Sequence, residues 1–298
     1  MELGNVLRLF QPIAIICLSV ASHGTGLAQS ASNGNSDAKT IVGMLEAWKS
    51  VAGRAATKSV EQAQSKYIAE RQLDEAIVSA RRADFKQAAD LFKSSVEAYA
   101  KADILSGENL YGVHNVTGML LLVQEQNDEA LAEFNRARDV AERLKGKASV
   151  EVIAACRNAA ICDIRAERNF ERARGALLDA LKGYQGLKMT DRAEYRSVLK
   201  WLAVCEVELK RNLEAIRYQT EVCDRLRARK VPNDMELADA IQILAQFYAH
   251  EKNWNSSRNC YDEAASIYEQ LGGTDDPAAK SARENALEMS RLIQSKDE

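Results

Sequence analysis

The stretch ADFKQAADLF, residues 83–92, recurs in altered form four more times along the chain. The later copies are EQNDEALAEF from Glu125, RNFERARGAL from Arg168, KRNLEAIRYQ from Lys210 and KNWNSSRNCY from Lys252. The sixth residue of every copy is small, and successive sixth residues are 42, 43, 42 and 42 positions apart: Ala88, Ala130, Ala173, Ala215 and Ser257. A period this regular indicates stacked supersecondary units. The repeat therefore decides the fold class before any single motif is considered.

The composition favours helix throughout. Only 3 of the 298 residues are proline, and alanine, leucine and charged residues dominate. Proline removes a backbone donor and clashes with the preceding helical turn, so long helices need a proline-poor sequence. The 40 basic and 43 acidic side chains leave a formal net charge of −3. Because nucleic acid requires a basic surface, the sequence argues against a nucleic-acid partner.

Each copy predicts the second helix of a helical hairpin. Turns between the paired helices centre on Asp84, Asn127, Asn169, Asn212 and Asn253, since asparagine and aspartate tolerate a left-handed conformation and bond their own backbone. The predicted helix pairs are 58–82 with 84–102, 108–125 with 127–145, 148–167 with 169–187, 191–209 with 211–229, and 234–251 with 253–271. The sequence thus predicts five hairpins.

Further segments flank the hairpins. Residues 29–37 are small and polar, and we expect a flexible leader there. Apolar residues spaced as on one helix face predict an N-terminal capping helix in 38–57, and a mostly polar pattern predicts a C-terminal capping helix at 276–295.

The repeats resemble tetratricopeptide repeats, in the 42-residue form found in kinesin light chains. Two columns carry the resemblance. In the second helix, the small residue is followed four positions later by a large one and seven later mostly by a small one; in the first helix, a small residue recurs at Ala76, Gly118, Ala160, Ala203 and Ala245. Gln219 and Ser257 depart from the pattern. The resemblance covers about residues 58–298 and implies an all-α solenoid, a right-handed superhelix of about five hairpins; an ordinary helical bundle is the alternative.

The first 28 residues have the pattern of a secretory signal peptide. Arg8 precedes an apolar run, and small residues lead to Ala28. We expect cleavage after Ala28, or alternatively after Ala21, and hence a periplasmic or secreted protein. The alternative is that the segment stays uncut and anchors the chain in a membrane.

Five cysteines remain beyond this segment, an odd number that cannot pair completely within one chain: Cys156, Cys162, Cys205, Cys223 and Cys260. Each lies among apolar neighbours in a predicted helix, so buried thiols are favoured over disulfides. Cys205 with Cys223 is the best candidate for a bridge, should one form.

No catalytic or metal-binding pattern is present in the sequence. Beyond residue 28 the histidines are His114 and His250, far apart in the array, and phosphate-loop, nucleophile-elbow and zinc-protease motifs are absent. We therefore expect no enzyme activity, no cofactor and no metal. A catalytic role for His250 is the minor alternative.

Partner binding fits the pattern better. In tetratricopeptide-like arrays the first helices line a concave groove. Three residues before the small column lie Leu73, Asn115, Arg157, Lys200 and Gln242, and one residue after it lie Ile77, Met119, Ile161, Val204 and Gln246. The first set is a mostly polar ladder that could bind an extended peptide. The second is an apolar ridge that either lines the groove or packs between hairpins.

We accordingly predict a protein- or peptide-binding scaffold. The candidate groove residues are Asn115, Arg157, Lys200, Gln242 and Gln246, with Arg157 and Lys200 attracting an acidic segment. The alternative is a structural repeat protein that self-associates and has no peptide ligand.

Overall fold

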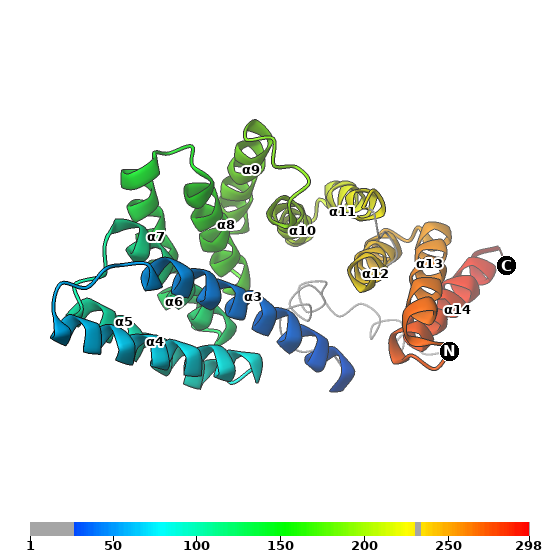
Figure 1. Cartoon of the computed structure of the whole chain (residues 1–298). Helices are drawn as coiled ribbons and strands as arrows, with labels where there is room; N and C mark the ends of the chain where they lie inside the picture. The colour runs from blue at the N-terminus through cyan, green and yellow to red at the C-terminus, as the bar shows by residue number, and fades with distance from the viewer. Residues whose placement is uncertain (1–26, 230–233, 298) are drawn as a thin grey trace. The chain divides into compact units, whose positions relative to one another are not determined.

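The computed structural model describes residues 27–229 and 234–297, and every regular element in these ranges is an α-helix (Figure 1). The predicted signal segment lies almost wholly outside the described residues. Among helices α3 to α14, none combines the length and the apolar composition that crossing a lipid bilayer requires.

Consecutive helices pair into hairpins, as the repeat predicts. The two helices of each hairpin pack against each other, and the second helices α5, α7 and α11 also pack against the first helix of the next hairpin. The paired helices are α4 (Val60–Arg81) with α5 (Phe85–Lys101), α6 (Gly107–Val123) with α7 (Asn127–Lys145), α8 (Val150–Arg165) with α9 (Phe170–Gly186), α10 (Ala193–Glu208) with α11 (Asn212–Arg227), and α12 (Met235–His250) with α13 (Trp254–Gly272). These bounds differ from the expected ones by at most two residues at either end.

The chain separates into two compact units. The N-terminal unit comprises the described residues up to Leu187, with α3 (Leu27–Gly53) through α9. The C-terminal unit begins at Lys188 and holds α10 through α14 (Pro277–Asp297).

Each turn within a hairpin contains a residue in the left-handed region, and it precedes the position that the sequence suggested. These residues are Ala83, Glu125, Glu167, Lys210 and Lys252, with φ between 51° and 62°. At each turn the next backbone N–H reaches the carbonyl five residues earlier, for example Asp84 N to Ser79 O at 3.0 Å. This bond satisfies a carbonyl at the helix end. Asp84 and Asn253 instead cap the following helix through their side chains, and only Asn169, with φ of 54°, is itself left-handed.

The small column of the second helices lies in the core, and the residues that depart from the repeat pattern have hydrogen-bond partners there. All five small residues are fully buried. Ser257 Oγ donates to Ala245 O on α12 at 2.8 Å. Gln219 Nε2 donates to Ala240 O, also on α12, at 2.8 Å. A polar side chain is therefore accommodated at each departure because it satisfies a backbone carbonyl.

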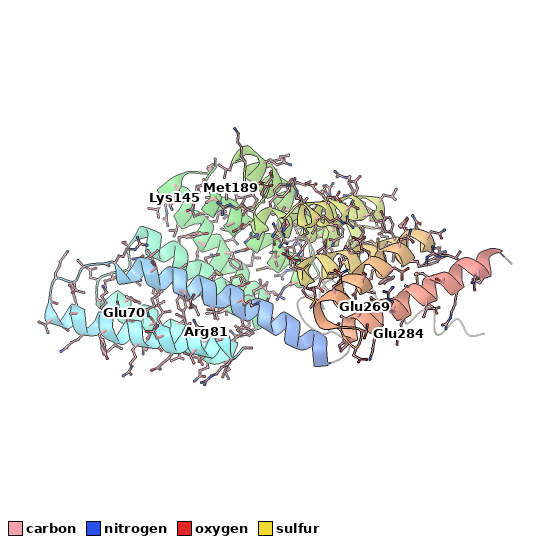
Figure 2. The ribbon with its side chains drawn as sticks, turned by 45° about the vertical axis from the view of Figure 1, so that its right-hand side comes forward. Glu70, Arg81, Lys145, Met189, Glu269 and Glu284 are labelled. Carbon is pink, nitrogen blue, oxygen red and sulfur yellow. The ribbon has the colours of Figure 1, made fainter. Side chains whose placement is uncertain are left out.

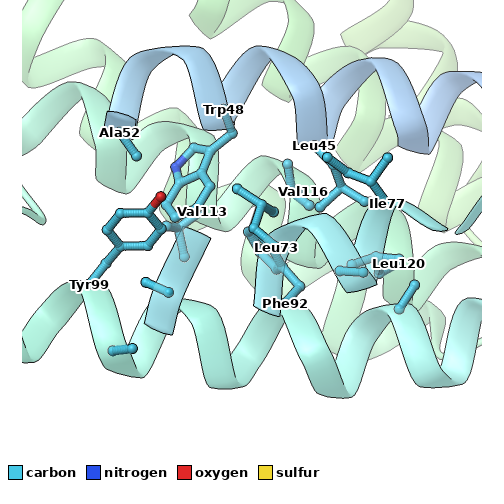
Figure 3. Close-up of a cluster of buried hydrophobic side chains, with 14 of the residues drawn as sticks. Leu45, Trp48, Ala52, Leu73, Ile77, Phe92, Tyr99, Val113, Val116 and Leu120 are labelled. Atoms are coloured by element: carbon cyan, nitrogen blue, oxygen red, sulfur yellow. The ribbon is translucent and has the colours of Figure 1, made fainter. Parts of the chain in front are cut away.

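Helix α3 is anchored in the core of the N-terminal unit by Trp48 (Figure 3). The indole packs edge-on against Phe92 and Tyr99 of α5, with ring centroids 5.2 and 4.9 Å away. Its Nε1 donates to Asn109 O at the start of α6, at 3.1 Å. Burial of the large apolar rings and a satisfied indole N–H together fix the helix.

The leader expected at residues 29–37 is part of this helix, because α3 begins at Leu27. Serine, asparagine and aspartate are only moderately unfavourable in a helix. Once Ile41, Leu45 and Trp48 hold the following turns in the core, adding turns at the N-terminal side costs little, since nucleation has already occurred.

In the C-terminal unit, α14 packs against α13 and closes the apolar core of the last hairpin. Ala286 and Met289 of α14 are buried with Ala245 and Tyr261. At the rim, Glu269 of α13, labelled in Figure 2, accepts bonds from Nε and Nη2 of Arg283 at 2.9 and 3.0 Å.

No disulfide bond joins any of these five cysteines in the structure. Cys162, Cys205 and Cys223 are buried, while Cys156 and Cys260 are partly exposed. Burial raises the pKa of the Cys162 and Cys223 thiols to about 12. A thiol with so high a pKa is a weak nucleophile at neutral pH, so these side chains serve as apolar packing.

Candidate functional site: the polar ladder of the first helices

The five predicted groove residues all lie on first helices and are all partly exposed. Asn115 on α6 and Arg157 on α8 belong to the N-terminal unit. Lys200 on α10 and Gln242 and Gln246 on α12 belong to the C-terminal unit. Each unit therefore has its own part of the ladder.

A hydrogen-bond chain joins the two ladder residues of the N-terminal unit. Arg157 donates through Nε and Nη2 to Asn158 Oδ1 at 3.1 and 2.9 Å. Asn158 Nδ2 in turn donates to Asn115 Oδ1 at 3.1 Å. Asn158 is buried, so it fixes the positions of both partly exposed neighbours. Within the described chain, Arg157 forms no salt bridge.

Asn158 was not a sequence candidate, although a signal for it exists. Later hairpins carry large apolar residues in its column, namely Trp201 and Ile243. Apart from the exposed Asp74 of the first hairpin, the column is otherwise apolar, and a polar side chain at such a position indicates a buried hydrogen bond.

Lys200 has an acidic partner within the C-terminal unit. Its Nζ lies 3.1 Å from Glu236 Oε1 on α12, and Glu236 also interacts with Arg196, at 3.7 Å, and with Arg229. Burial acts to raise the pKa of Glu236, but the Lys200 charge, hydrogen bonds from Arg229 and Lys200, and the Arg196 charge lower it to about 2. Glu236 is therefore ionised at neutral pH. An acidic ligand for Lys200 has to share or replace this partner.

On α12, Gln242 and Gln246 follow Asp239 along one face, at spacings of three and four residues. The Oε1 atom of Gln246 is buried and has no hydrogen-bond partner among the described residues. Asp239 accepts a bond from Tyr268 Oη at 2.6 Å. The carboxyl group is exposed, yet desolvation by surrounding protein outweighs the Tyr268 bond and the Lys200 charge and raises its pKa.

The apolar ridge belongs mainly to the packing. Ile77, Ile161 and Val204 are buried, and Met119 is partly exposed. Of the two interpretations that the sequence allowed, packing between helices therefore accounts for most of this column.

Helix α3 covers part of the first helices of hairpins one and two. It packs against α4 and α6, and the ladder position of the first hairpin, Leu73, is buried in the same cluster. Farther along α3, the Asp37 carboxylate interacts electrostatically with Arg165 near the end of α8. A partner at these hairpins therefore meets α3 as well as the first helices.

His114 and His250 each lie within hydrogen-bonding distance of a side chain on a neighbouring helix. His114 Nδ1 lies 2.7 Å from Glu133 Oε2 on the paired helix α7. His250, the last residue of α12, is exposed and lies 3.1 Å from Asn212 Nδ2. Within the described ranges there is no cluster of three or more histidine, cysteine or acidic side chains suited to a metal ion.

No protein-family model and no curated protein matches this sequence. Solved structures do share its fold. BtubC (BKLC) from P. vanneervenii superposes with a TM-score of 0.57 at 20% identity, over 72% of this chain and 94% of its own. The TPR-like repeats of a putative kinesin light chain from Podosopora anserina give 0.54 at 12% identity, over 72% and 99%. A Rap protein complexed with competence and sporulation factor gives 0.54 at 12%, over 86% and 77%. The chain thus has a tetratricopeptide-like repeat fold.

Proposed function

We propose that this protein is a non-catalytic scaffold that binds a protein or peptide segment along its first helices. The observation that carries the proposal is a contrast between two columns. The small column of the second helices is fully buried in all five hairpins, whereas the ladder column is partly exposed and polar in four, with a different side chain in most hairpins. Conserving the packing while varying an accessible position is how a repeat array combines one shape with a particular specificity.

The chemistry of the ladder suits an extended segment. Carboxamides such as Gln242 and Gln246 both donate and accept hydrogen bonds, as a peptide backbone requires. Arg157 offers donors that no carboxylate in the described chain neutralises, whereas Lys200 is paired with Glu236. Arg157 is therefore the stronger candidate for contact with an acidic side chain. The Rap complex supports the proposal in one respect: a protein of this fold has been found with a bound factor.

Capture experiments with matched variants test the ladder. The wild type, Arg157→Gln with Lys200→Gln, and Gln242→Ala with Gln246→Ala are immobilised and exposed to a native extract of the source cells. Bound proteins are quantified by mass spectrometry. We expect each ladder variant to lose about tenfold of a specific partner, because a few central side chains dominate binding.

A charge-matched control is available in Lys147→Gln with Lys182→Gln. Their side chains are 87% and 76% exposed and neither lies on a first helix. The control should bind the partner as the wild type does, and helical circular dichroism should be the same for all variants. Equal capture by the ladder variants and the control would refute the assignment.

A structural repeat protein without a peptide ligand is the second candidate. Exposed apolar side chains on α4 favour self-association of this kind.

A further inference from the structure

Helix α4 has an exposed face at the outer edge of the N-terminal unit (Figure 1). We call it the outer face of α4 and define it by Val60, Tyr67, Ile68, Arg71, Glu75 and Val78, which lie within one side of the helix at 100° per residue. Val60 and Tyr67 are 76% and 68% exposed, and Ile68 and Val78 are 47% and 42% exposed. Four large apolar side chains on one helix are therefore open to solvent.

Two of the columns that make up this face are buried in helices that have a preceding hairpin in the same unit. Helices α6, α8 and α12 pack against the preceding second helices α5, α7 and α11. In these three helices the column of Val78 contains Leu120, Cys162 and Phe247, all buried, and the column of Arg71 contains Val113, Ala155 and Ala240, also buried. Helix α3 does not take this place on α4, because it packs on the side of Leu73 and Ile77. The fold thus leaves open on α4 a face that it covers elsewhere with a helix.

The outer face is also complementary to itself. Arg71 and Glu75 form an intrahelical pair, with Nε and Oε1 3.6 Å apart and side chains 65% and 54% exposed. Arg71 lies two residues before position 73 and Glu75 two residues after it. Ile68 lies five residues before the same position and Val78 five residues after it. An antiparallel pair of α4 helices centred at this height places Arg71 of each copy against Glu75 of the other, and Ile68 against Val78. A two-fold symmetric interface requires this kind of self-complementarity.

We infer that the outer face of α4 is a surface for self-association, through which a second copy of this chain packs its own α4 antiparallel. The contact buries Ile68 and Val78 of both copies, and exposed Tyr67 adds aromatic area of the kind enriched at interfaces. The two symmetric Arg71–Glu75 contacts set the register. This surface is distinct from the ladder of the first helices, so the inference does not depend on the proposed ligand.

The test reverses the charge of Arg71 or Glu75 singly and then exchanges the two charges in a double variant. Sedimentation of the full-length protein across a dilution series measures how strongly each variant dimerises. Glu75→Arg makes both central positions positive in each copy, and Arg71→Glu makes both negative. Each single variant should weaken the dimer by at least about tenfold, because two attractive contacts become repulsive. The double variant Arg71→Glu with Glu75→Arg should regain the wild-type dimer. An equimolar mixture of the two single variants should form a heterodimer.

Because both side chains are exposed, these variants should keep the helical circular dichroism of the wild type. Arg291→Glu on α14, whose side chain is 74% exposed and paired with Glu288, is the control and should leave the dimer unchanged. A wild type that stays monomeric throughout, a dimer that ignores both single reversals, or a failure of the charge exchange to restore it would each overturn the inference. Partner capture by the ladder is measured separately, so the two proposals can fail independently.

Discussion

At the scale of single residues, charge and burial decide which ladder side chains are available to a ligand. Lys200 and Arg157 are both cations in the same column, but Lys200 is paired with Glu236 whereas Arg157 donates to a neutral amide. The neighbours that make this difference come from other positions in the sequence. Residue identity therefore predicts the charge of the ladder but not whether that charge is free.

Glu236 provides a prediction at this scale. Its folded-state pKa of about 2 is below the ordinary value of 4.5, so its pairing stabilises the fold above pH 4.5 and is lost as the pH falls from 4.5 toward 2. The side chain is 38% exposed, so solvent screening reduces the contribution to about 1 kcal/mol. Glu236→Gln should lower the free energy of unfolding by this amount at pH 7, and the deficit should shrink below pH 4.5.

Urea unfolding at several pH values measures the effect. Glu97→Gln, an exposed position on α5, is the control and should change stability little at any pH. A deficit for Glu236→Gln that does not depend on pH would contradict the ionic explanation.

At the scale of helices, glycine marks where two elements approach closely. On α6, a Cβ at Gly112 would lie 2.4 Å from Trp48 Cδ1 of α3. At Gly175, within α9, an added Cβ meets nothing within 4 Å. The same substitution should therefore have opposite effects at the two sites.

Gly112→Ala should destabilise the protein by roughly 1–3 kcal/mol, because the indole has to move and α3 loses its anchor. Gly175→Ala should stabilise it by about 0.5–1 kcal/mol through lower backbone entropy in the unfolded chain. Denaturant unfolding monitored by tryptophan fluorescence compares the two. A stabilising Gly112→Ala would show that α3 does not pack tightly on α6.

At the scale of the whole molecule, the first segment of the sequence carries a proposal about where the protein acts. We propose that residues 1–28 export the protein to the periplasm or outside the cell. Intact-mass measurement of the protein purified from its native cells should show a chain that starts at Gln29, or at Ser22 if cleavage follows Ala21. Recovery of the full 298-residue chain from the membrane fraction would favour the uncut anchor, and recovery from the cytoplasm would exclude export.

The sequence by itself determined the hairpins, their order and their helical bounds. Periodicity is a local property: the 42-residue spacing of small residues and the 3.6-residue spacing of apolar ones are both visible without any contact being known. The ladder positions on the first helices could be named for the same reason. Asn158 and Asp239 were missed because their importance comes from neighbours one hairpin or one helix away.

Only the tertiary structure decided what covers each face. The pattern of residues 38–57 predicted an amphipathic helix but not the helices that it packs on. An apolar stripe shows which side of a helix is buried, but it does not identify the element that covers that side. In the structure, α3 packs against the first helices α4 and α6, and the outer face of α4 stays open. Likewise, the stretch at residues 83–92 predicted a repeat, but its left-handed turn residue, Ala83, has no sequence signal; the backbone bond between Asp84 and Ser79 imposes that conformation.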